Sequence, residues 1–324
     1  MAISNSYSSF SKISTSCFLL IYYVSILLPS ANSVSFNITS FNPDLMDIQY
    51  DGDATPEAGS IQFNRVDYLY RVGQAVYSNS IPIWDSDTGK VANFTTHFTF
   101  RIDTGDSVPT RYGHGLSFFL APFCFQIPPN SGGGFLGLFN TRTSNSSRNG
   151  IVSVEFDSNP DTEWDPNYEH VGININSIAS KVTAPWNASL HRSEIGNAWI
   201  VYNSSAMNLS VYWSYGSNPN SSISYLVDLK EILPRRVMVG FSAATGIYVE
   251  KHFVYSWELS SDLDFNLDSS IEKWDTDLII IVSLGVTVGI AAAVLETLLI
   301  IMAIKNYRKR SNGNKEVTNL ASSM

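Results

Sequence analysis

The sequence predicts an all-β protein, consisting of one β-sandwich or jelly-roll domain and a single transmembrane helix. Many short segments alternate between apolar and polar residues, as Phe94 to Ile102 does, and this period of two is typical of strands with one buried face. Turn-forming clusters such as 85–89 and 218–220 separate these segments, and long helical periodicity is absent between them. This pattern over residues 34–259 therefore predicts one large sandwich rather than several small domains.

Residues 1–33 predict a secretory signal peptide. Lys12 precedes an apolar run from Cys17 to Leu28, and Ala31 and Ser33 provide the small residues of a cleavage site. The run is too short to span a bilayer as a helix. We therefore expect export, with an ectodomain that begins at residue 34.

Several segments after Ile102 continue the strand pattern. They are Leu116–Leu120, Ile151–Val154, Val171–Ile175, Leu209–Trp213 and Arg236–Phe241. Trp186, Trp199, Trp213 and Trp257 are interpreted as core residues, because an alternating tryptophan in a sandwich is buried more often than it forms a sugar platform.

The cysteines and the sequons agree with export. Cys124 is the only cysteine after the predicted signal peptide, so no disulfide is expected within the mature chain. Its apolar neighbours predict a buried thiol. Asn-x-Ser/Thr sequons predict N-glycosylation at Asn37, Asn93, Asn145, Asn187, Asn203, Asn208 and Asn220.

An acidic cluster follows the strand pattern at 151–154. Val152, Val154 and Phe156 are expected to point into the core, which puts Glu155 and Asp157 side by side on the opposite face. Two adjacent carboxylates repel unless a cation, a shared proton or water lies between them. Together with Asp165 and His170, they form an oxygen-plus-imidazole set that suits Ca²⁺ beside a transition ion such as Mn²⁺.

Glycoside hydrolysis is the alternative chemistry for this cluster. Jelly-roll glucanases also place two carboxylates two residues apart on a strand, with a further Glu beyond them as catalytic partner. Here Asn159 and Pro160 stand where that Glu would fall. The sequence also lacks a Gly-x-Ser-x-Gly nucleophile motif. We therefore expect a binding protein and no enzyme.

A second apolar run predicts a transmembrane helix at residues 278–304. Its only charged residue is Glu296, and a helix of this length, about 40 Å, exceeds a hydrocarbon core of about 30 Å. Residues 260–277 form a polar, acidic stalk, and residues 305–324 form a short basic tail. The positive-inside rule predicts a type I single-pass protein of the plasma membrane with the tail in the cytoplasm.

Charge differs between the two sides of the predicted span. Residues 34–277 hold 14 lysines and arginines against 27 aspartates and glutamates, a net charge of −13. The ectodomain has no basic stripe, so nucleic acid is not an expected partner.

Gly285 and Gly289 match a close-packing motif of membrane helices, which makes a homodimer one expected partnership. Glu296 indicates another, with a second membrane protein.

The ectodomain resembles a legume-type (L-type) lectin domain. The matching segments, in chain order, are Ser35–Phe41, Val76–Tyr77 with Ile83–Asp85, Gly115–Pro122, Gly133–Leu138, Val154–Asp157, His170–Ser177 and Val239–Gly246. The resemblance implies a legume-lectin jelly-roll sandwich. The added signal peptide and span are similar to those of plant lectin-domain receptor-like kinases.

The resemblance also implies roles for the acidic cluster. Glu155, Asp157, Asp165 and His170 match the family's transition-metal ligands, and two of them, Asp157 and Asp165, also bridge to Ca²⁺. Asn159 matches a position that offers a backbone carbonyl to Ca²⁺. In a match without gaps, Asp161 stands where the family has an Asn; with a gap, Asn159 takes that position instead.

The implied sugar site departs from the family pattern. The family uses an Asp, a Gly amide, an Asn amide and an aromatic platform. In this chain His114 stands at the Asp position and Asp161 at the Asn position. Histidine lacks the two acceptor oxygens of a carboxylate, and an ionised Asp cannot donate to a sugar hydroxyl. The remaining implied site residues are Gly133 or Gly134 for the amide, and Gly246, Ile247 and Tyr248 for the lining loop.

Two functions are therefore expected from the sequence. The first is a metal-dependent receptor-like protein that binds carbohydrates or glycoconjugates. Residues 305–324 contain none of the protein kinase motifs, so signalling is expected through a membrane kinase partner. The alternative is an adhesion or co-receptor module with a decayed sugar site, which binds a non-sugar ligand or another receptor.

Overall fold

The computed structural model describes residues 33–264, except 106, 108–110, 193 and 217, together with residues 301–305. The chain divides into two units, Met1–Phe265 and Asn266–Met324. The predicted signal peptide before Ser33, the stalk beyond residue 264, the span up to residue 300 and the tail after Lys305 lie outside the described residues. In the part of the chain that is described, no helix has the length and apolar character needed to cross a membrane.

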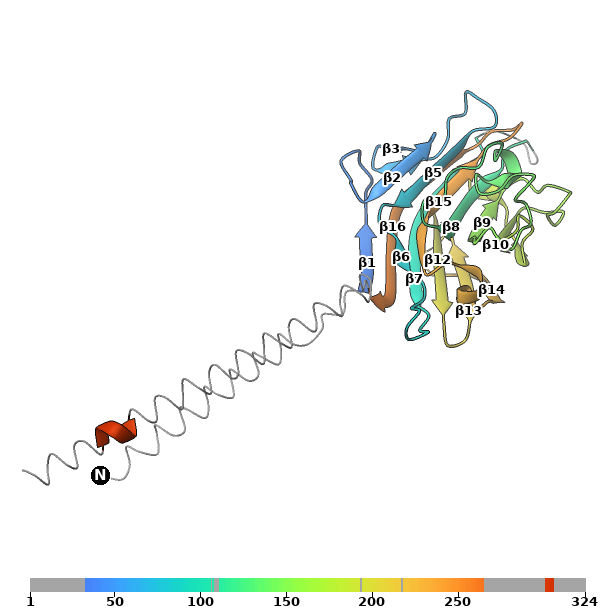
Figure 1. The fold of residues 1–324 in the computed structure, drawn as a ribbon. Coiled ribbons are helices and arrows are strands. Elements are labelled where there is room, and N and C mark those ends of the chain that lie inside the picture. The colour runs from blue at the N-terminus through green and yellow to red at the C-terminus, as the bar shows by residue number, and fades with distance from the viewer. Residues whose placement is uncertain are drawn as a thin grey trace, which may run out of the picture. The chain divides into compact units, whose positions relative to one another are not determined.

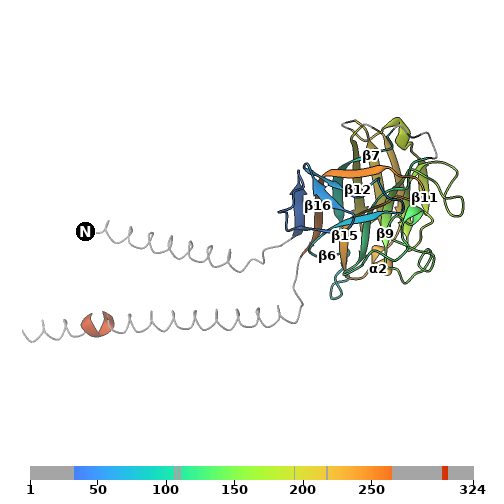
Figure 2. The same cartoon turned by 90° about the horizontal axis from the view of Figure 1, so that it is seen from above.

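Two antiparallel sheets face each other and build the first unit (Figures 1 and 2). Within the described residues, the first sheet has the order β14 (Ser221–Leu226), β13 (Asn208–Ser214), β12 (Gly196–Asn203), β7 (Phe94–Asp103), β16 (Lys251–Asp264), β4 (Ser60–Gln62) and β3 (Thr55–Glu57), and β1 (Ser33–Ile38) also pairs with β16. Strand β16 continues past residue 259, where the predicted domain ends.

The second sheet carries residues of the predicted metal cluster, because Glu155, Asp157 and His170 belong to its strands. Its order in the described residues is β11 (Val182–Pro185), β10 (His170–Ile175), β9 (Val152–Asp157), β8 (Gly115–Pro122), β15 (Arg236–Ala244), β5 (Val72–Tyr77) and β2 (Ile48–Gly52), and β6 (Ile81–Pro82) also pairs with β15. Short helical turns are η1 (Gly133–Phe135), η2 (Ala188–Leu190) and α2 (Leu229–Ile232). The predicted all-β sandwich is confirmed.

Aromatic side chains fill the space between the two sheets. Phe98 and Trp257 of the first sheet pack against Phe241 of the second, with ring centroids 4.8 and 4.9 Å from the Phe241 ring. Phe118 lies 5.6 Å from the same ring. All of these side chains are buried, so the alternation seen in the sequence does mark a core face.

The second sheet is buried on both faces. Val152, Val154 and Phe156 of β9 belong to the main core, as predicted. A smaller apolar cluster covers the opposite face of the sheet and includes Leu138 and Phe139 from the segment between β8 and β9. Every residue of β9 is therefore buried. This second cover encloses the face that carries Glu155 and Asp157.

The prediction of a buried Cys124 is wrong. Its thiol is free and exposed. The apolar strand β8 ends at Pro122, and the backbone turns there, because the Phe125 N–H donates to the Pro122 carbonyl at 2.9 Å. The turn also carries Phe123 outward, where it is 55% exposed. Apolar neighbours in sequence therefore predicted burial at a place where the chain has already left the sheet.

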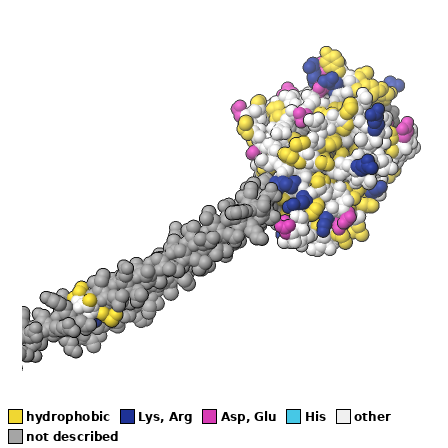
Figure 3. Space-filling model, viewed as in Figure 1, with side chains coloured by type: hydrophobic (Ala, Val, Ile, Leu, Met, Phe, Trp, Pro, Cys, Tyr) yellow, Lys and Arg dark blue, Asp and Glu magenta, His cyan; other side chains and the backbone are white. Residues whose placement is uncertain are grey.

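The core assignment of the tryptophans is confirmed for three of the four. Trp186, Trp213 and Trp257 are buried. Trp199 is only half-buried and stacks on His97 at 4.7 Å, on the outer face of the first sheet. On the face of the unit seen in Figure 3, basic and acidic side chains lie singly or in small groups, without a basic stripe.

Candidate functional site: an acidic metal cluster beside a glycine-lined site

Strands β9 and β10 bring the buried charges of the acidic cluster together. Their antiparallel register sets His170 opposite Asp157 and Gly172 opposite Glu155. His170 Nε2 lies 3.1 Å from Glu155 Oε1 and 3.9 Å from an oxygen of Asp165. One ligand atom from each of Glu155, Asp165 and His170 falls within 4.8 Å of the other two. These three predicted ligands thus share one small volume.

The loop between β9 and β10 holds the remaining carboxylates in place. The Asn159 N–H donates to Asp157 Oδ1 at 2.8 Å. The Asp161 N–H donates to Asp165 Oδ2 at 2.8 Å, and the Asp165 N–H donates back to the Asp161 carbonyl at 2.9 Å. The backbone therefore fixes the direction of both aspartates, as a ligand loop requires.

Burial shifts the protonation of these groups. The pKa of Asp165 rises to about 7, first because the carboxyl is buried and then because Glu155 is close. The pKa of Asp157 is raised well above its ordinary range by burial and by the charges of Asp165 and Glu155. Burial lowers the pKa of His170, but its hydrogen bond with Glu155 and the charges of Glu155 and Asp165 raise it more.

The donor set fits the two predicted ions. Buried carboxylates that repel one another need a compensating charge. Oxygen ligands suit Ca²⁺, and an imidazole nitrogen among carboxylates suits Mn²⁺ or a similar ion. Glu155, Asp165 and His170, with Asp157 beside them, are the residues that would hold metal. The individual ligand assignments stay predictions.

A positioning residue that the sequence reasoning missed is Ser180. Its hydroxyl lies 2.6 Å from Glu155 Oε1 and 3.1 Å from Asn174 Oδ1. Gly172 leaves room for it, because a Cβ there would lie 2.0 Å from Ser180 Oγ and 2.8 Å from Glu155 Oε1. No local motif marks Ser180, since only the folding of the chain after β10 brings it onto the cluster.

His114 lies at the centre of the predicted sugar site. The backbone N–H of His114 donates to the Ala244 carbonyl at 2.8 Å, and its backbone carbonyl accepts from the Ser158 N–H at 3.1 Å. Its ring nitrogen Nδ1 is 3.5 Å from Asp161 Oδ2, and the Asn159 amide nitrogen is 3.4 Å from both ring nitrogens. Both candidates for the family's Asn position therefore contact His114.

Glycines allow these side chains to come close to the backbone. A Cβ at Gly246 would lie 2.3 Å from His114 Nε2, and a Cβ at Gly134 would lie 1.8 Å from Asp161 Oδ2. The Gly133 N–H donates to the Thr245 carbonyl at 2.9 Å. The structure thus brings together all the predicted glycines of this site.

The rim of the site includes the predicted loop at Ile247 and Tyr248 and a second loop, at Tyr68 and Leu69, that the sequence reasoning did not assign. Ile247 is 57% exposed, and Tyr248 is half-buried beside it. The Tyr70 N–H donates to the Gly246 carbonyl at 3.1 Å, which attaches the exposed loop at Tyr68 and Leu69 to the same rim. This contact joins residues far apart in sequence, so no local pattern could reveal it.

The predicted glycosylation sites differ in access. The side-chain nitrogen of Asn93 donates to Asp262 at 2.7 Å, and that of Asn208 donates to Ser210 at 2.9 Å. Both asparagines are half-buried. The exposed sequon asparagines are Asn37, Asn145, Asn187, Asn203 and Asn220. We expect glycans at the exposed group first, and their occupancy stays a prediction.

Residues 33–295 match the legume lectin domain family, and the chain belongs to this family. It is similar to the L-type lectin-domain containing receptor kinase IX.1 of Arabidopsis thaliana, with 40% identity over 93% of this chain and 47% of the receptor kinase. The chain thus spans about half the length of that relative.

Solved lectins share the fold. Lectin II from Ulex europaeus has a TM-score of 0.67 and 39% identity, over 72% of this chain and 100% of the lectin chain. The lectin from Bauhinia forficata, solved in complex with GalNAc, has a TM-score of 0.64 and 34% identity over the same shares. The sandwich of the first unit is therefore a legume lectin carbohydrate-binding fold.

Proposed function

We propose that this protein is a membrane-anchored, receptor-like lectin that binds carbohydrates or glycoconjugates when its metal site is filled. One observation carries the proposal. Asp161 belongs to both groups of residues, because its backbone N–H donates to Asp165 and its carboxylate reaches His114. The acidic cluster and the glycine-lined site are therefore physically connected through this residue.

Bound metal would prepare this loop for a ligand. Legume lectins generally bind Ca²⁺ and a transition metal, and we propose Ca²⁺ with Mn²⁺ for this chain. The ions would supply the positive charge that the buried carboxylates need. Glu155, Asp165 and His170 would hold them, while Asp161 and Asn159 of the same loop lie against the His114 ring. Preformed loops matter because ordering them during binding would lower the affinity for a sugar.

The legume lectin domain is a binding domain and no enzymatic reaction is proposed. The relation to a receptor kinase and the predicted leader and span support a place in the plasma membrane, with the lectin domain outside the cell. We propose a membrane kinase or a second copy of the chain as protein partner. Glu296 favours such a partner, since a carboxylate within a bilayer needs a polar contact.

A glycan array on the full-length protein in detergent tests the proposal, with metal content measured on the same sample. We expect Ca²⁺ and Mn²⁺ to be bound and glycan binding to vanish with chelator. Binding should return when Ca²⁺ and Mn²⁺ are added, and it should not return with Mg²⁺, which prefers a smaller octahedral site. Glycan binding that survives complete removal of the metals would contradict the proposal.

A second candidate function is an adhesion or co-receptor module with a decayed sugar site. The observation that favours it is the position of the His114 side chain, which is only 8% exposed and lies over Gly246, where it offers little surface to a sugar. In this candidate the metals would serve only the fold. An array without signal, on protein that retains Ca²⁺ and Mn²⁺, would favour this function over the first.

A further inference from the structure

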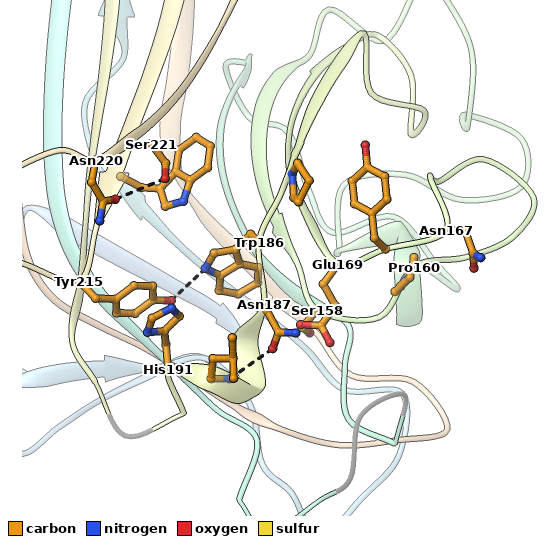
Figure 4. A pocket seen from close by; sticks show the side chains of 14 residues that line it. Ser158, Pro160, Asn167, Glu169, Trp186, Asn187, His191, Tyr215, Asn220 and Ser221 are labelled. Atoms are coloured by element: carbon orange, nitrogen blue, oxygen red, sulfur yellow. Dashed lines mark hydrogen bonds between the residues drawn. The ribbon is translucent and has the colours of Figure 1, made fainter.

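The outer face of the first sheet contains a groove of about 460 Å³, and Trp199 forms part of its lining. Among the described residues, this groove has no lining residue in common with the pocket of about 620 Å³ that Trp186 and Tyr215 line (Figure 4). Neither His114 nor Gly246 of the predicted sugar site lines the groove. The first sheet therefore has a cavity that the proposed function does not use.

The strand register builds the groove from two neighbouring rows of side chains. The first row crosses four strands from β1 to β12 and consists of Asn37, Glu258, His97 and Trp199. The second row lies two residues along each of these strands and consists of Ser35, Ser260, Thr95 and Val201. Residues two apart on a strand share one face of the sheet. Because the side chains of the second row are smaller, they leave a groove beside the first row.

Contacts within the first row hold its rings in place. His97 stacks on Trp199 with ring centroids 4.7 Å apart and planes 7° from parallel. Its ring nitrogen Nε2 lies 3.1 Å from Asn197 Oδ1, and its Nδ1 lies 3.4 Å from Glu258 Oε1. The half-buried Trp199 is thus fixed before a ligand arrives, so binding does not have to order it.

The polar groups of the groove suit an uncharged ligand that donates hydrogen bonds. The Glu258 side chain is 51% exposed, and its carboxylate can accept from hydroxyl or amide N–H groups. No lysine or arginine of the described chain lines the groove, so an anion would lack a partner. An indole beside a carboxylate and the exposed hydroxyls of Ser35, Thr95 and Ser260 matches a sugar, which has an apolar ring face and polar edges.

The groove begins at a sequon asparagine. Asn37 lines it, is exposed and belongs to β1, which in the described part of the chain pairs only with β16. Neighbouring strands are about 4.8 Å apart, so Trp199 lies three spacings, roughly 14 Å, along the row from Asn37. The two N-acetylglucosamine rings that begin an N-glycan extend over such a distance. Their attachment at Asn37 would give them a high effective concentration in the groove.

We propose that this groove is a binding site for the protein's own N-glycan. The first two sugars of a glycan on Asn37 lie along the row, with a sugar ring on Trp199 and hydroxyl or amide groups on Glu258. The glycan thereby covers the indole on the solvent side of the sheet. This site is independent of the proposed sugar binding, since none of its residues belongs to the glycine-lined site.

Enzymatic deglycosylation of the folded, full-length protein in detergent tests the proposal. Peptide-N-glycosidase converts each released asparagine to aspartate, so mass spectrometry measures the release rate at Asn37. We expect release to be about tenfold faster from Trp199→Ala than from the wild type, because one ring contact contributes about this factor. Tyr212→Ala is the matched control. Tyr212 is exposed opposite Trp199 on β13 but does not line the groove, so its variant should match the wild type.

Oxidation of Trp199 by hydroxyl radicals gives a second measurement, which leaves the residues of the groove wall unchanged. Asn37→Gln should raise the oxidation of Trp199, because the ring loses its cover. Asn145→Gln removes an exposed sequon between β8 and β9 and should leave the oxidation as it is. The proposal is overturned if Asn37 carries no glycan, if folded Trp199→Ala releases it no faster than Tyr212→Ala, or if both sequon variants oxidise Trp199 equally.

Discussion

At the residue scale, His114 and Asp161 determine the chemistry of the glycine-lined site. His114 offers ring nitrogens where the family pattern has carboxylate oxygens, and Asp161 adds a carboxylate 3.5 Å from that ring. The two departures occur together, and they place an imidazole rather than a second carboxylate beside Asp161. Two aspartates at the same places would repel. Neither position can therefore be understood by itself.

A double substitution tests this coupling. We expect His114→Asp together with Asp161→Asn to raise binding of simple monosaccharides, because the pair restores a carboxylate acceptor and an amide donor. His114→Asp alone should not gain binding, since its new carboxylate would face Asp161. A glycan array and calorimetry on the wild type, both single variants and the double variant measure the coupling. Equal gains in the single and double variants would refute it.

At the scale of elements, the pairing of β9 with β10 sets the geometry of the acidic cluster. Gly172 stands opposite Glu155 in this pairing, and its missing side chain leaves the space that Ser180 uses. The strands would pair without this space, but the Glu155 carboxylate would lose its hydrogen bond from Ser180. Gly172 is therefore needed for the position of the Glu155 carboxylate rather than for the pairing of the strands.

The substitution Gly172→Ala tests that role. Its Cβ would displace Ser180 and Glu155, so we expect metal affinity to fall by about tenfold, the lower end of losses measured when groups that orient ligands are changed. Isothermal titration of the metal-free protein with Mn²⁺ provides the measurement. Gly216→Ala is the matched control, because a Cβ there meets only Ser214 Oγ at 3.5 Å. Equal Mn²⁺ affinities in the two variants would argue against the role.

At the scale of the whole molecule, the core depends on rings from both sheets. Phe241 contacts Phe98, Phe118 and Trp257, which come from β7, β8 and β16. We expect Phe241→Ala to lower the free energy of unfolding by about 3–5 kcal/mol. Phe123→Ala, at an exposed position, should change it by no more than about 0.5 kcal/mol. Urea unfolding followed by circular dichroism compares the two; similar losses would show that the core is elsewhere.

The buried carboxylates also make stability depend on pH and metal together. The pKa of Asp165 is raised from 3.8 to about 7 in the folded chain. The folded state then binds more protons than the unfolded state, so without metal this group destabilises the fold as pH rises from about 4 to about 7. Metal needs the deprotonated ligands, so its stabilisation grows over the same range.

We therefore expect the melting temperature with Ca²⁺ and Mn²⁺ to exceed that with chelator by more at about pH 7.5 than at about pH 5. The raised pKa of His170 acts in the same direction, because its proton stabilises the metal-free fold and is lost as pH rises. Differential scanning fluorimetry across this range provides the measurement. A difference that stays constant with pH would mean that these groups do not bind the metals.

The sequence by itself determined the sandwich and the core face of strands such as β7, because alternation reports which side chains are buried. It placed Glu155 and Asp157 on one face of β9 and predicted His170 and Asp165 as their neighbours, since these residues lie close together in the chain. It could not show that this face is covered, and the same limit led to the wrong prediction for Cys124. Burial depends on segments that pack from elsewhere.

Only the tertiary structure decided the contacts between distant segments. It brought Ser180 into a hydrogen bond with Glu155, and the Tyr70 backbone into one with Gly246. It also placed the His114 side chain between Asp161 and Gly246. It also formed a pocket that Trp186 and Tyr215 line, between β11 of the second sheet and the β13–β14 hairpin of the first. The physical reason is the same in each case. Period and motif describe a chain locally, whereas these contacts exist only after two sheets and their loops have packed together.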